Sequence, residues 1–193
     1  MAPALPAAAS NTVSIPVHRI VDSKAHFAAG SLERFWHVIW PQAVIDFGRG
    51  AIHLETTDGP GAIAHTAADR PIFEGLQRGA LNLMLTDHLP LYWDNARSLP
   101  GVTTLDRGYH LSIIAVRFAH PDRAPFLSVN TCVHEMLHAI LGDIFVSHPS
   151  AVQSTRREYR VDWYATRLWA FHDGGALRRI AQEYVTRLRR HAP

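Results

Sequence analysis

The sequence predicts an α+β fold in which a small mixed or antiparallel sheet packs against helices. Two observations predict it. Short apolar stretches, some of them alternating, indicate strands before residue 120, whereas longer stretches with one apolar stripe indicate helices after residue 127. The composition of the 193 residues is that of an ordinary globular domain, with 47% hydrophobic and 19% charged residues.

One domain is expected over residues 13–193, because this length suits a single core and leaves little room for a second. Residues 1–12, MAPALPAAASNT, are rich in alanine and proline and are expected to form a disordered tail. The tail lacks the positive charge that opens a secretory signal, and no apolar run approaches the roughly 20 residues of a membrane helix. The cytoplasm is therefore the expected location by default.

Strands are expected at four segments in the N-terminal part of the chain: 12–22, 51–57, 81–89 and 110–118. The sequence DGPGA at 58–62 predicts a turn after the second of them. The apolar residues of SLERFWHVIW at 31–40 share one helical stripe, and Pro41 predicts the end of that helix. The stretch 90–108 has the composition of a loop, and so long a loop in a compact domain often has a function.

The segment VNTCVHEMLHAILGD, residues 129–143, predicts the most distinctive helix of the chain. It is expected to start after Ser128 or Asn130, which are both good N-caps, and to stop at Gly142. Most of its side chains are small or apolar on every side, so the helix is predicted to be buried.

Three ionisable side chains lie within this apolar helix, in the pattern HExxH. His134 and His138 stand four residues apart and share a helix face, so both rings can bind one zinc ion. Glu135 is offset by one position and can take a proton from a zinc-activated water, which makes it the candidate general base. Burying these groups without partners is costly, and a bound metal removes that difficulty.

A catalytic zinc ion normally has three protein ligands and leaves its fourth position for water. The downstream candidates for the third ligand are Asp143, His148, Glu158, Asp162 and His172. The next helix is expected over residues 154–172, with an inward apolar stripe that includes Val161 and Ala165. Glu158 and Asp162 fall on the same stripe. Glu158 can therefore ligate the metal, and Asp162 can accept the other ring N–H of a ligand histidine.

The last helix is expected over residues 176–190, with its apolar residues on one stripe and its arginines mainly on the other face. We interpret these arginines as a solvated outer face of a packed helix. The net charge of the chain is only +2, so neither nucleic acid nor membrane is an expected partner. Cys132 is the only cysteine; it excludes an intramolecular disulfide and is predicted to be a buried thiol.

The motif TCVHEMLHAI, residues 131–140, resembles the zinc-binding helix of zincin metallopeptidases, and EYRVD, residues 158–162, extends the resemblance. In gluzincins of the thermolysin type, a glutamate ligand lies about 20 residues beyond the second histidine of HExxH, with an aspartate four residues later. Glu158 and Asp162 have this spacing from His138. The resemblance covers about 30 of the 193 residues. It implies a minimal zincin-like domain with one zinc ion bound by the two histidines and Glu158.

The sequence also departs from the patterns of related enzymes. Leu141 and Ile144 stand where metzincins have a glycine and a third histidine, which disfavours that branch. Thermolysin-type enzymes use a downstream tyrosine and histidine to stabilise the oxyanion, and neither of these motifs is matched. The candidates for this role are Tyr109, His148, Tyr159, Tyr164 and His172.

The expected function is hydrolysis of a peptide or protein substrate by a zinc-activated water, with Glu135 as general base. In zincins an edge strand before the metal helix pairs with the substrate, and 110–118 stands in the right place; an internal strand without that role is the alternative. Two other functions stay open. The first alternative is a zinc hydrolase that acts on a non-peptide amide. The second is a binding or structural protein in which a fourth protein ligand, such as His148, occupies the open position of the zinc ion. Glu135 disfavours the last reading, because a structural site needs no base.

Overall fold

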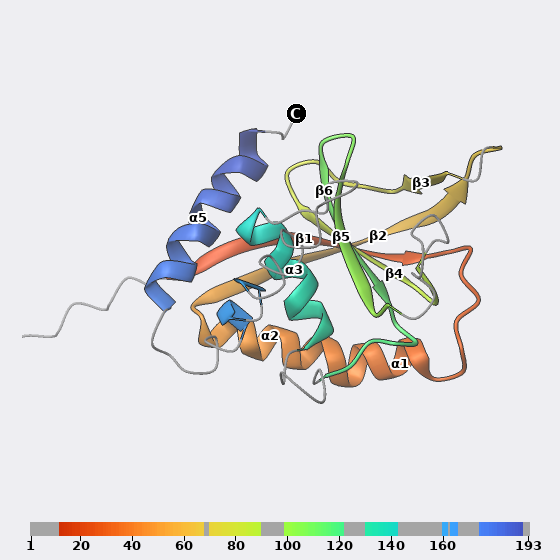
Figure 1. The fold of residues 1–193 in the computed structure, drawn as a ribbon, viewed down its shortest axis with the longest axis horizontal. Helices are drawn as coiled ribbons and strands as arrows, with labels where there is room; N and C mark the ends of the chain where they lie inside the picture. Colours follow the sequence, from red (N-terminus) through yellow and green to blue (C-terminus); the bar gives the residue numbers. More distant parts are fainter. Residues whose placement is uncertain are drawn as a thin grey trace, which may run out of the picture.

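The computed structural model describes residues 12–67, 70–89, 99–121, 130–142, 160–161, 163–165 and 174–190. These residues form an α+β fold around one six-stranded mixed sheet, which is strongly curved and nearly closed (Figure 1). The predicted fold class is confirmed at this level. The tail predicted at residues 1–12 lies outside the described residues, apart from Thr12. None of the described helices is long and apolar enough to cross a membrane.

The sheet has four parallel strands at its centre and one antiparallel strand at each end. The order is β3-β2-β1-β4-β6-β5. The strands are β1 Val13–Asp22, β2 Ile52–His65, β3 Pro71–Glu74, β4 Leu81–Thr86, β5 Gly101–Asp106 and β6 Tyr109–Ala115. β1 runs parallel to β2 and β4, and β4 runs parallel to β6, whereas β3 and β5 are antiparallel to β2 and β6. Each of the four predicted strand segments therefore contains a strand.

The stretch 90–108, predicted as a loop, contains the strand β5. Only Thr103 of its six residues is buried, so the segment lacks the apolar alternation that identifies a strand. β5 takes one end of the sheet, and β6 lies between β4 and β5. Of the two alternatives for 110–118, an edge strand and an internal strand, the structure shows the internal one. β6 is internal, and its residues from His110 to Ala115 are all buried.

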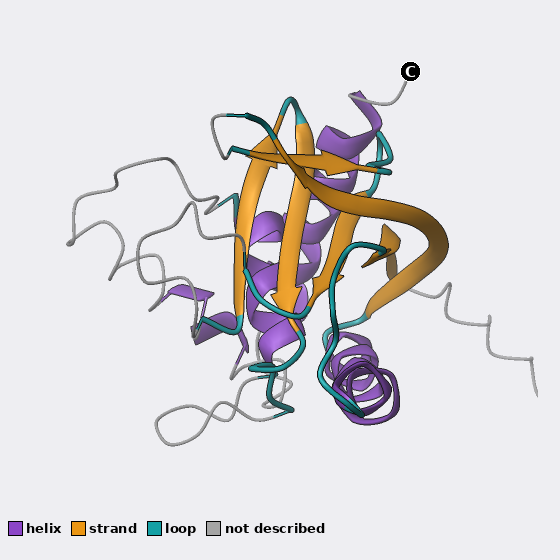
Figure 2. Ribbon diagram, turned by 90° about the vertical axis from the view of Figure 1, so that its right-hand side faces the viewer, coloured by secondary structure: helices purple, strands orange, loops and turns teal. Residues whose placement is uncertain are grey.

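β2 continues through 58–62, where the sequence predicted a turn. A Cβ atom on Gly59 would lie 2.4 Å from Cε1 of His18, and one on Gly61 would lie 2.4 Å from the carbonyl oxygen of Glu74. Glycine inside a strand often marks such a close approach of neighbouring atoms. The glycines of DGPGA therefore serve packing within a long strand, which curves around the side of the sheet in Figure 2.

The first helical region is longer than predicted. Helix α1 (Ser31–Arg34), a π-helical turn (Phe35–Ile39) and helix α2 (Trp40–Arg49) follow one another without a break. Pro41 is the second residue of α2, directly after the π-helical turn, and the helix continues beyond it to Arg49. The prediction that Pro41 ends the helix is therefore wrong.

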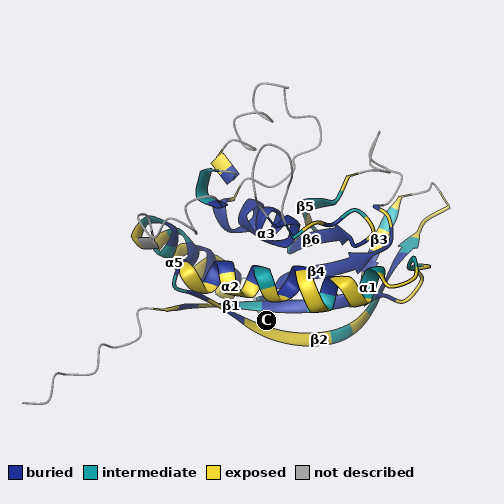
Figure 3. Ribbon diagram, turned by 90° about the horizontal axis from the view of Figure 1, so that it is seen from below, coloured by how far each residue is buried: buried dark blue, intermediate teal, exposed yellow. Residues whose placement is uncertain are grey.

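Helices α3 (Thr131–Leu141) and α5 (Gly174–Arg190) lie where the sequence predicted them. They pack with α2 on one face of the sheet, and a smaller apolar cluster fills the other face. The buried stripe of α5 consists of Leu177, Ala181, Tyr184, Val185 and Leu188. Figure 3 shows α3 as a buried element, whereas α2 and α5 expose part of their surface.

Part of the helix predicted over residues 154–172 is described. Residues 160–161 and 163–165 are helical. Val161 and Ala165 are buried in the same apolar cluster as α3, as the sequence predicted. The described residues of this segment therefore pack against the same apolar core as α3, with the predicted stripe facing inward.

Candidate functional site

Both ends of α3 are fixed by local interactions. The Asn130 side chain caps the first turn, because its Oδ1 accepts the backbone N–H of Cys132 at 2.8 Å and that of Val133 at 3.3 Å. The amide nitrogen of Asn130 donates to the carbonyl of Ile39 at 2.8 Å and so ties α3 to the π-helical turn. Gly142 follows the helix in the left-handed conformation, with φ of 74°. The predicted cap at Asn130 and the predicted stop at Gly142 are confirmed.

Every residue of α3 is buried, including its three ionisable ones. The exposed fractions of His134, Glu135 and His138 are 3%, 6% and 8%. The helix contacts β5, β6, α2 and α5, which surround it. The predicted burial of α3 is confirmed. Its three ionisable side chains therefore need hydrogen bonds or a metal, since buried polar groups without such partners are strongly disfavoured.

The two histidines direct their Nε2 atoms towards each other. The two nitrogens are 3.1 Å apart, and the rings lie nearly perpendicular, with an interplanar angle of 77°. Tetrahedral zinc with Zn–N bonds of about 2.0–2.1 Å holds two ligand nitrogens about 3.3–3.4 Å apart. The observed separation is close to that value, so His134 and His138 fit one zinc ion bound by both rings.

Glu135 extends from α3 to the first half of β5. Its Oε2 lies 3.0 Å from the hydroxyl of Thr103, and its backbone oxygen lies 2.7 Å from the same hydroxyl and 3.3 Å from that of Ser112. Gly101 makes room for the carboxyl group, because a Cβ atom there would lie 2.8 Å from Oε1 of Glu135. The candidate base is therefore held against the strand that ends the sheet.

Cys132 is fully buried two positions before His134, as predicted. Burial raises the pKa of its thiol strongly, and the negative charge of Glu135 raises it further. The side chain is therefore a neutral thiol that packs in the core. It has neither the thiolate character of a nucleophile nor that of a metal ligand.

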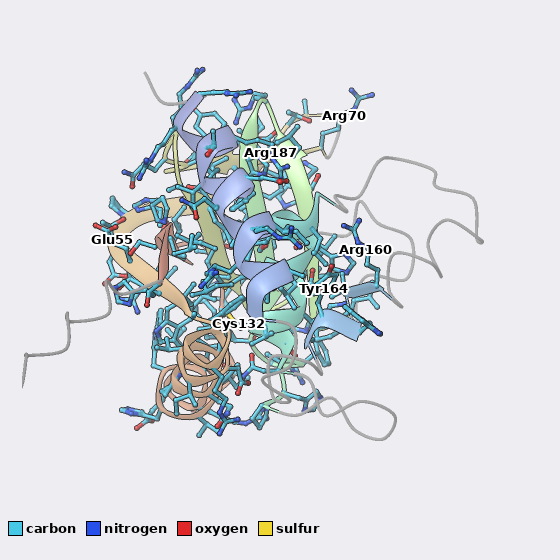
Figure 4. All side chains as sticks on the ribbon, turned by 90° about the vertical axis from the view of Figure 1, so that its left-hand side faces the viewer. Glu55, Arg70, Cys132, Arg160, Tyr164 and Arg187 are labelled. Atoms are coloured by element: carbon cyan, nitrogen blue, oxygen red, sulfur yellow. The ribbon has the colours of Figure 1, made fainter. Side chains whose placement is uncertain are left out.

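Most of the predicted residues beyond α3 lie outside the described part of the chain: Asp143, His148, Glu158, Tyr159, Asp162 and His172. Within the described ranges, no three His, Cys, Asp or Glu side chains converge as a metal-binding group. The third ligand and its aspartate support therefore stay predictions. Arg160 and Tyr164, on either side of position 162, lie beside α3 in Figure 4, and Val161 and Ala165 share its apolar cluster.

The two described tyrosine candidates lie in different places. Tyr109 begins β6 at the end of the hairpin away from Gly101, and its hydroxyl accepts a long hydrogen bond from Arg78 at 3.4 Å. The structure does not bring Tyr109 to Glu135. Tyr164 is half-buried, packs against the main apolar cluster and meets the ring of Trp163 edge-to-face at 4.8 Å.

Sequence reasoning missed Gly101 and Thr103, the residues of β5 that lie against the carboxyl group of Glu135. Gly101 and Thr103 fall in the segment predicted as a loop, and no local pattern relates them to a helix about 30 residues away in the sequence. No known protein family, curated protein or solved structure matches this chain. The geometry of α3 and β5 therefore carries the functional interpretation.

Proposed function

We propose that this protein is a zinc-dependent metallopeptidase with a zincin-like site, in which His134, His138 and Glu158 bind one zinc ion. The proposal is carried by the 3.1 Å separation of the two histidine Nε2 atoms on a fully buried helix. A single cation can bind both nitrogens, and the two nitrogens lie within hydrogen-bond distance of each other. Glu158 enters the proposal from its spacing in EYRVD, and Asp162 is assigned to the second ring N–H of a ligand histidine.

Glu135 acts as the general base in this proposal. Zinc, when bound, supplies Lewis-acid polarisation and makes a water molecule more acidic. The Glu135 carboxylate accepts the proton that the attacking water loses and returns it to the amine that leaves the cleaved amide. Its position beside Gly101 and Thr103 supports this role, because the base then stands next to the strand edge where a substrate can lie.

An extended peptide is the substrate that fits β5 best. β5 pairs with β6 on one side, and its other edge has no partner among the described strands. A peptide added there as a further strand is held by main-chain hydrogen bonds, with its scissile bond beside Glu135. The substrate role that the sequence suggested for 110–118 is thus reassigned to Gly101–Asp106.

Zinc content and peptide cleavage test the proposal together. Purified wild type, Glu135→Gln, His134→Ala and Glu158→Ala are loaded with zinc, dialysed, analysed for metal and incubated with a mixed peptide library. Glu135→Gln is expected to keep its zinc and lose cleavage, because it retains the ligands and removes the base. His134→Ala and Glu158→Ala are expected to lose most of the zinc. His37→Ala, which alters an exposed histidine, is the matched control and keeps both properties.

Each contrary outcome points elsewhere. Full zinc retention by Glu158→Ala moves the third ligand to another candidate, such as His148 or Asp143. A zinc-loaded wild type that cleaves no library peptide contradicts the peptidase assignment. Activity on a library of non-peptide amides then identifies the other hydrolase, and zinc without activity on either library identifies a structural site.

A further inference from the structure

We propose that Thr103, two residues after Gly101 on β5, is a positioning residue that fixes the carboxyl group of Glu135 for catalysis. The inference rests on the proposed function, since it assigns Glu135 the role of base. It adds to that function a determinant on a different element, the edge strand, about 30 positions away in the sequence. Thr103 acts through Glu135 and needs no contact with zinc or substrate.

The hydroxyl of Thr103 meets Glu135 at two points. It lies 3.0 Å from the carboxylate Oε2 and 2.7 Å from the backbone oxygen of the same residue. Thr103 is 4% exposed, so water competes little for these contacts. Because the hydroxyl has one hydrogen, it donates to one of these two oxygens at a time, and either bond links Thr103 to Glu135.

Gly101 restricts the same carboxyl group by shape. It stands two residues before Thr103 and so faces α3 from the same side of the strand. A Cβ atom on Gly101 would lie 2.5 Å from Cγ of Glu135, and 2.8 Å from both Cδ and Oε1. The carboxyl group therefore occupies the volume that any other residue at position 101 would fill.

A hydroxyl suits this position because it both donates and accepts hydrogen bonds. It donates to Oε2 while Glu135 is a carboxylate. When Glu135 has taken the proton of the attacking water, Oε2–H donates to the Thr103 oxygen, and the Thr103 hydrogen turns to the backbone oxygen 2.7 Å away. Both arrangements are compatible with the same heavy-atom positions, so the carboxyl group needs no repositioning between the two proton transfers.

Ser112 provides an internal comparison. Its hydroxyl lies 3.0 Å from that of Thr103 and 3.3 Å from the backbone oxygen of Glu135, and no contact joins it to the carboxylate. Removing Ser112 therefore perturbs the same buried polar cluster and leaves the carboxyl anchor in place. The contrast between Thr103 and Ser112 separates positioning of the base from general support of the fold.

The test compares Thr103→Val, Thr103→Ser and Ser112→Ala with wild type in the zinc-loaded protein. kcat and KM are measured with the library peptide that wild type cleaves best, together with zinc content and the urea midpoint. Thr103→Val is expected to lower kcat about 10- to 100-fold, with KM and zinc content unchanged, because misplacing a catalytic group costs up to roughly 100-fold. Thr103→Ser, which keeps the hydroxyl, and Ser112→Ala are expected to stay within about threefold of wild type.

Gly101→Ala keeps the proposal testable if Thr103→Val fails to fold. The three atoms nearest to the added methyl group all belong to the flexible side chain of Glu135, so we expect this side chain to move while the fold persists. We expect kcat to fall and zinc to stay bound. Normal kcat in Gly101→Ala or in folded Thr103→Val, with wild type active, overturns the positioning role and leaves the peptidase proposal intact. Inactive zinc-loaded wild type overturns the peptidase proposal itself, and the positioning role with it.

Discussion

The N-cap of α3 offers a direct measurement of what holds the candidate site in place. Asn130 is 1% exposed and makes three hydrogen bonds, two to the first turn of α3 and one to the carbonyl of Ile39. Asn130→Ala removes all of them. Loss of an N-cap costs about 1 kcal/mol, and loss of one further buried hydrogen bond costs about 1 kcal/mol. The free energy of unfolding is therefore expected to fall by about 2 kcal/mol.

Asn130→Ser divides this cost into its two parts. Serine caps a helix about as well as asparagine, but its short side chain cannot donate to Ile39. The serine variant is therefore expected to lose about 1 kcal/mol and the alanine variant about twice that. The difference between the two variants measures the cap, and the difference between serine and wild type measures the link to the π-helical turn.

Urea unfolding followed by far-UV circular dichroism measures both differences. The experiments are carried out with a chelator present, because metal bound only to the native state would add its own stabilisation. A lower urea midpoint at constant slope indicates a true loss of stability. Gln182→Ala, which removes an exposed amide side chain from α5, is the control and is expected to change stability by less than about 0.5 kcal/mol. An Asn130→Ala midpoint equal to that of wild type refutes the reasoning.

Two further predictions concern α5 and β5. The Tyr184 hydroxyl is buried without a hydrogen-bond partner among the described residues, so Tyr184→Phe is expected to raise unfolding free energy by about 1 kcal/mol in urea at neutral pH. Burial raises the pKa of Tyr184 despite the nearby Arg187, so on raising the pH the unfolded state loses the tyrosine proton before the folded state does. The unfolding free energy of wild type is therefore expected to fall above about pH 10, by at most about 1.36 kcal/mol per pH unit from this group. Tyr184→Phe lacks this group, so its stability is expected to fall less steeply. Leu105 is 49% exposed on β5, so Leu105→Ser is expected to leave stability unchanged but to raise KM for peptides with apolar side chains. The control is Val38→Ser, which alters a residue that is 45% exposed on the π-helical turn and is expected to keep the wild-type KM. Equal KM values for the two variants contradict substrate pairing with β5.

The parts of the fold that the sequence predicted correctly have local causes. α3 is bounded by a side chain that caps its first turn and by Gly142, whose left-handed φ stops it, and both signals lie within the segment itself. The stripe of α5 follows from the spacing of its apolar residues in the same way. The spacing of His134 and His138 likewise places them on one helix face, whatever the rest of the chain does.

The errors arose where neighbours distant in the sequence decide the structure. Gly59 and Gly61 read as turn residues, yet the atoms of His18 and Glu74 pressing on them explain why glycine stands there. Pro41 read as a helix end because the π-helical turn before it was not predicted. The choice of Glu158 as third ligand also depends on distant neighbours, because it requires the helix predicted over residues 154–172 to lie against α3; Glu158 is outside the described residues, so this choice stays a prediction.

The missed strand β5 shows why an element beside the candidate site can escape recognition from local pattern. β5 lies at one end of the sheet and only one of its six residues is buried, so its sequence carries no apolar pattern. The residue types on β5 fit their neighbours instead. The carboxyl group of Glu135 fills the space that a side chain at Gly101 would need, and Thr103 carries a hydroxyl 3.0 Å from that carboxyl group. The buried acid that made α3 look anomalous in the sequence thus accounts for two residues of β5. That reciprocal fit holds the candidate base against β5, the strand to which we propose that a peptide substrate is added.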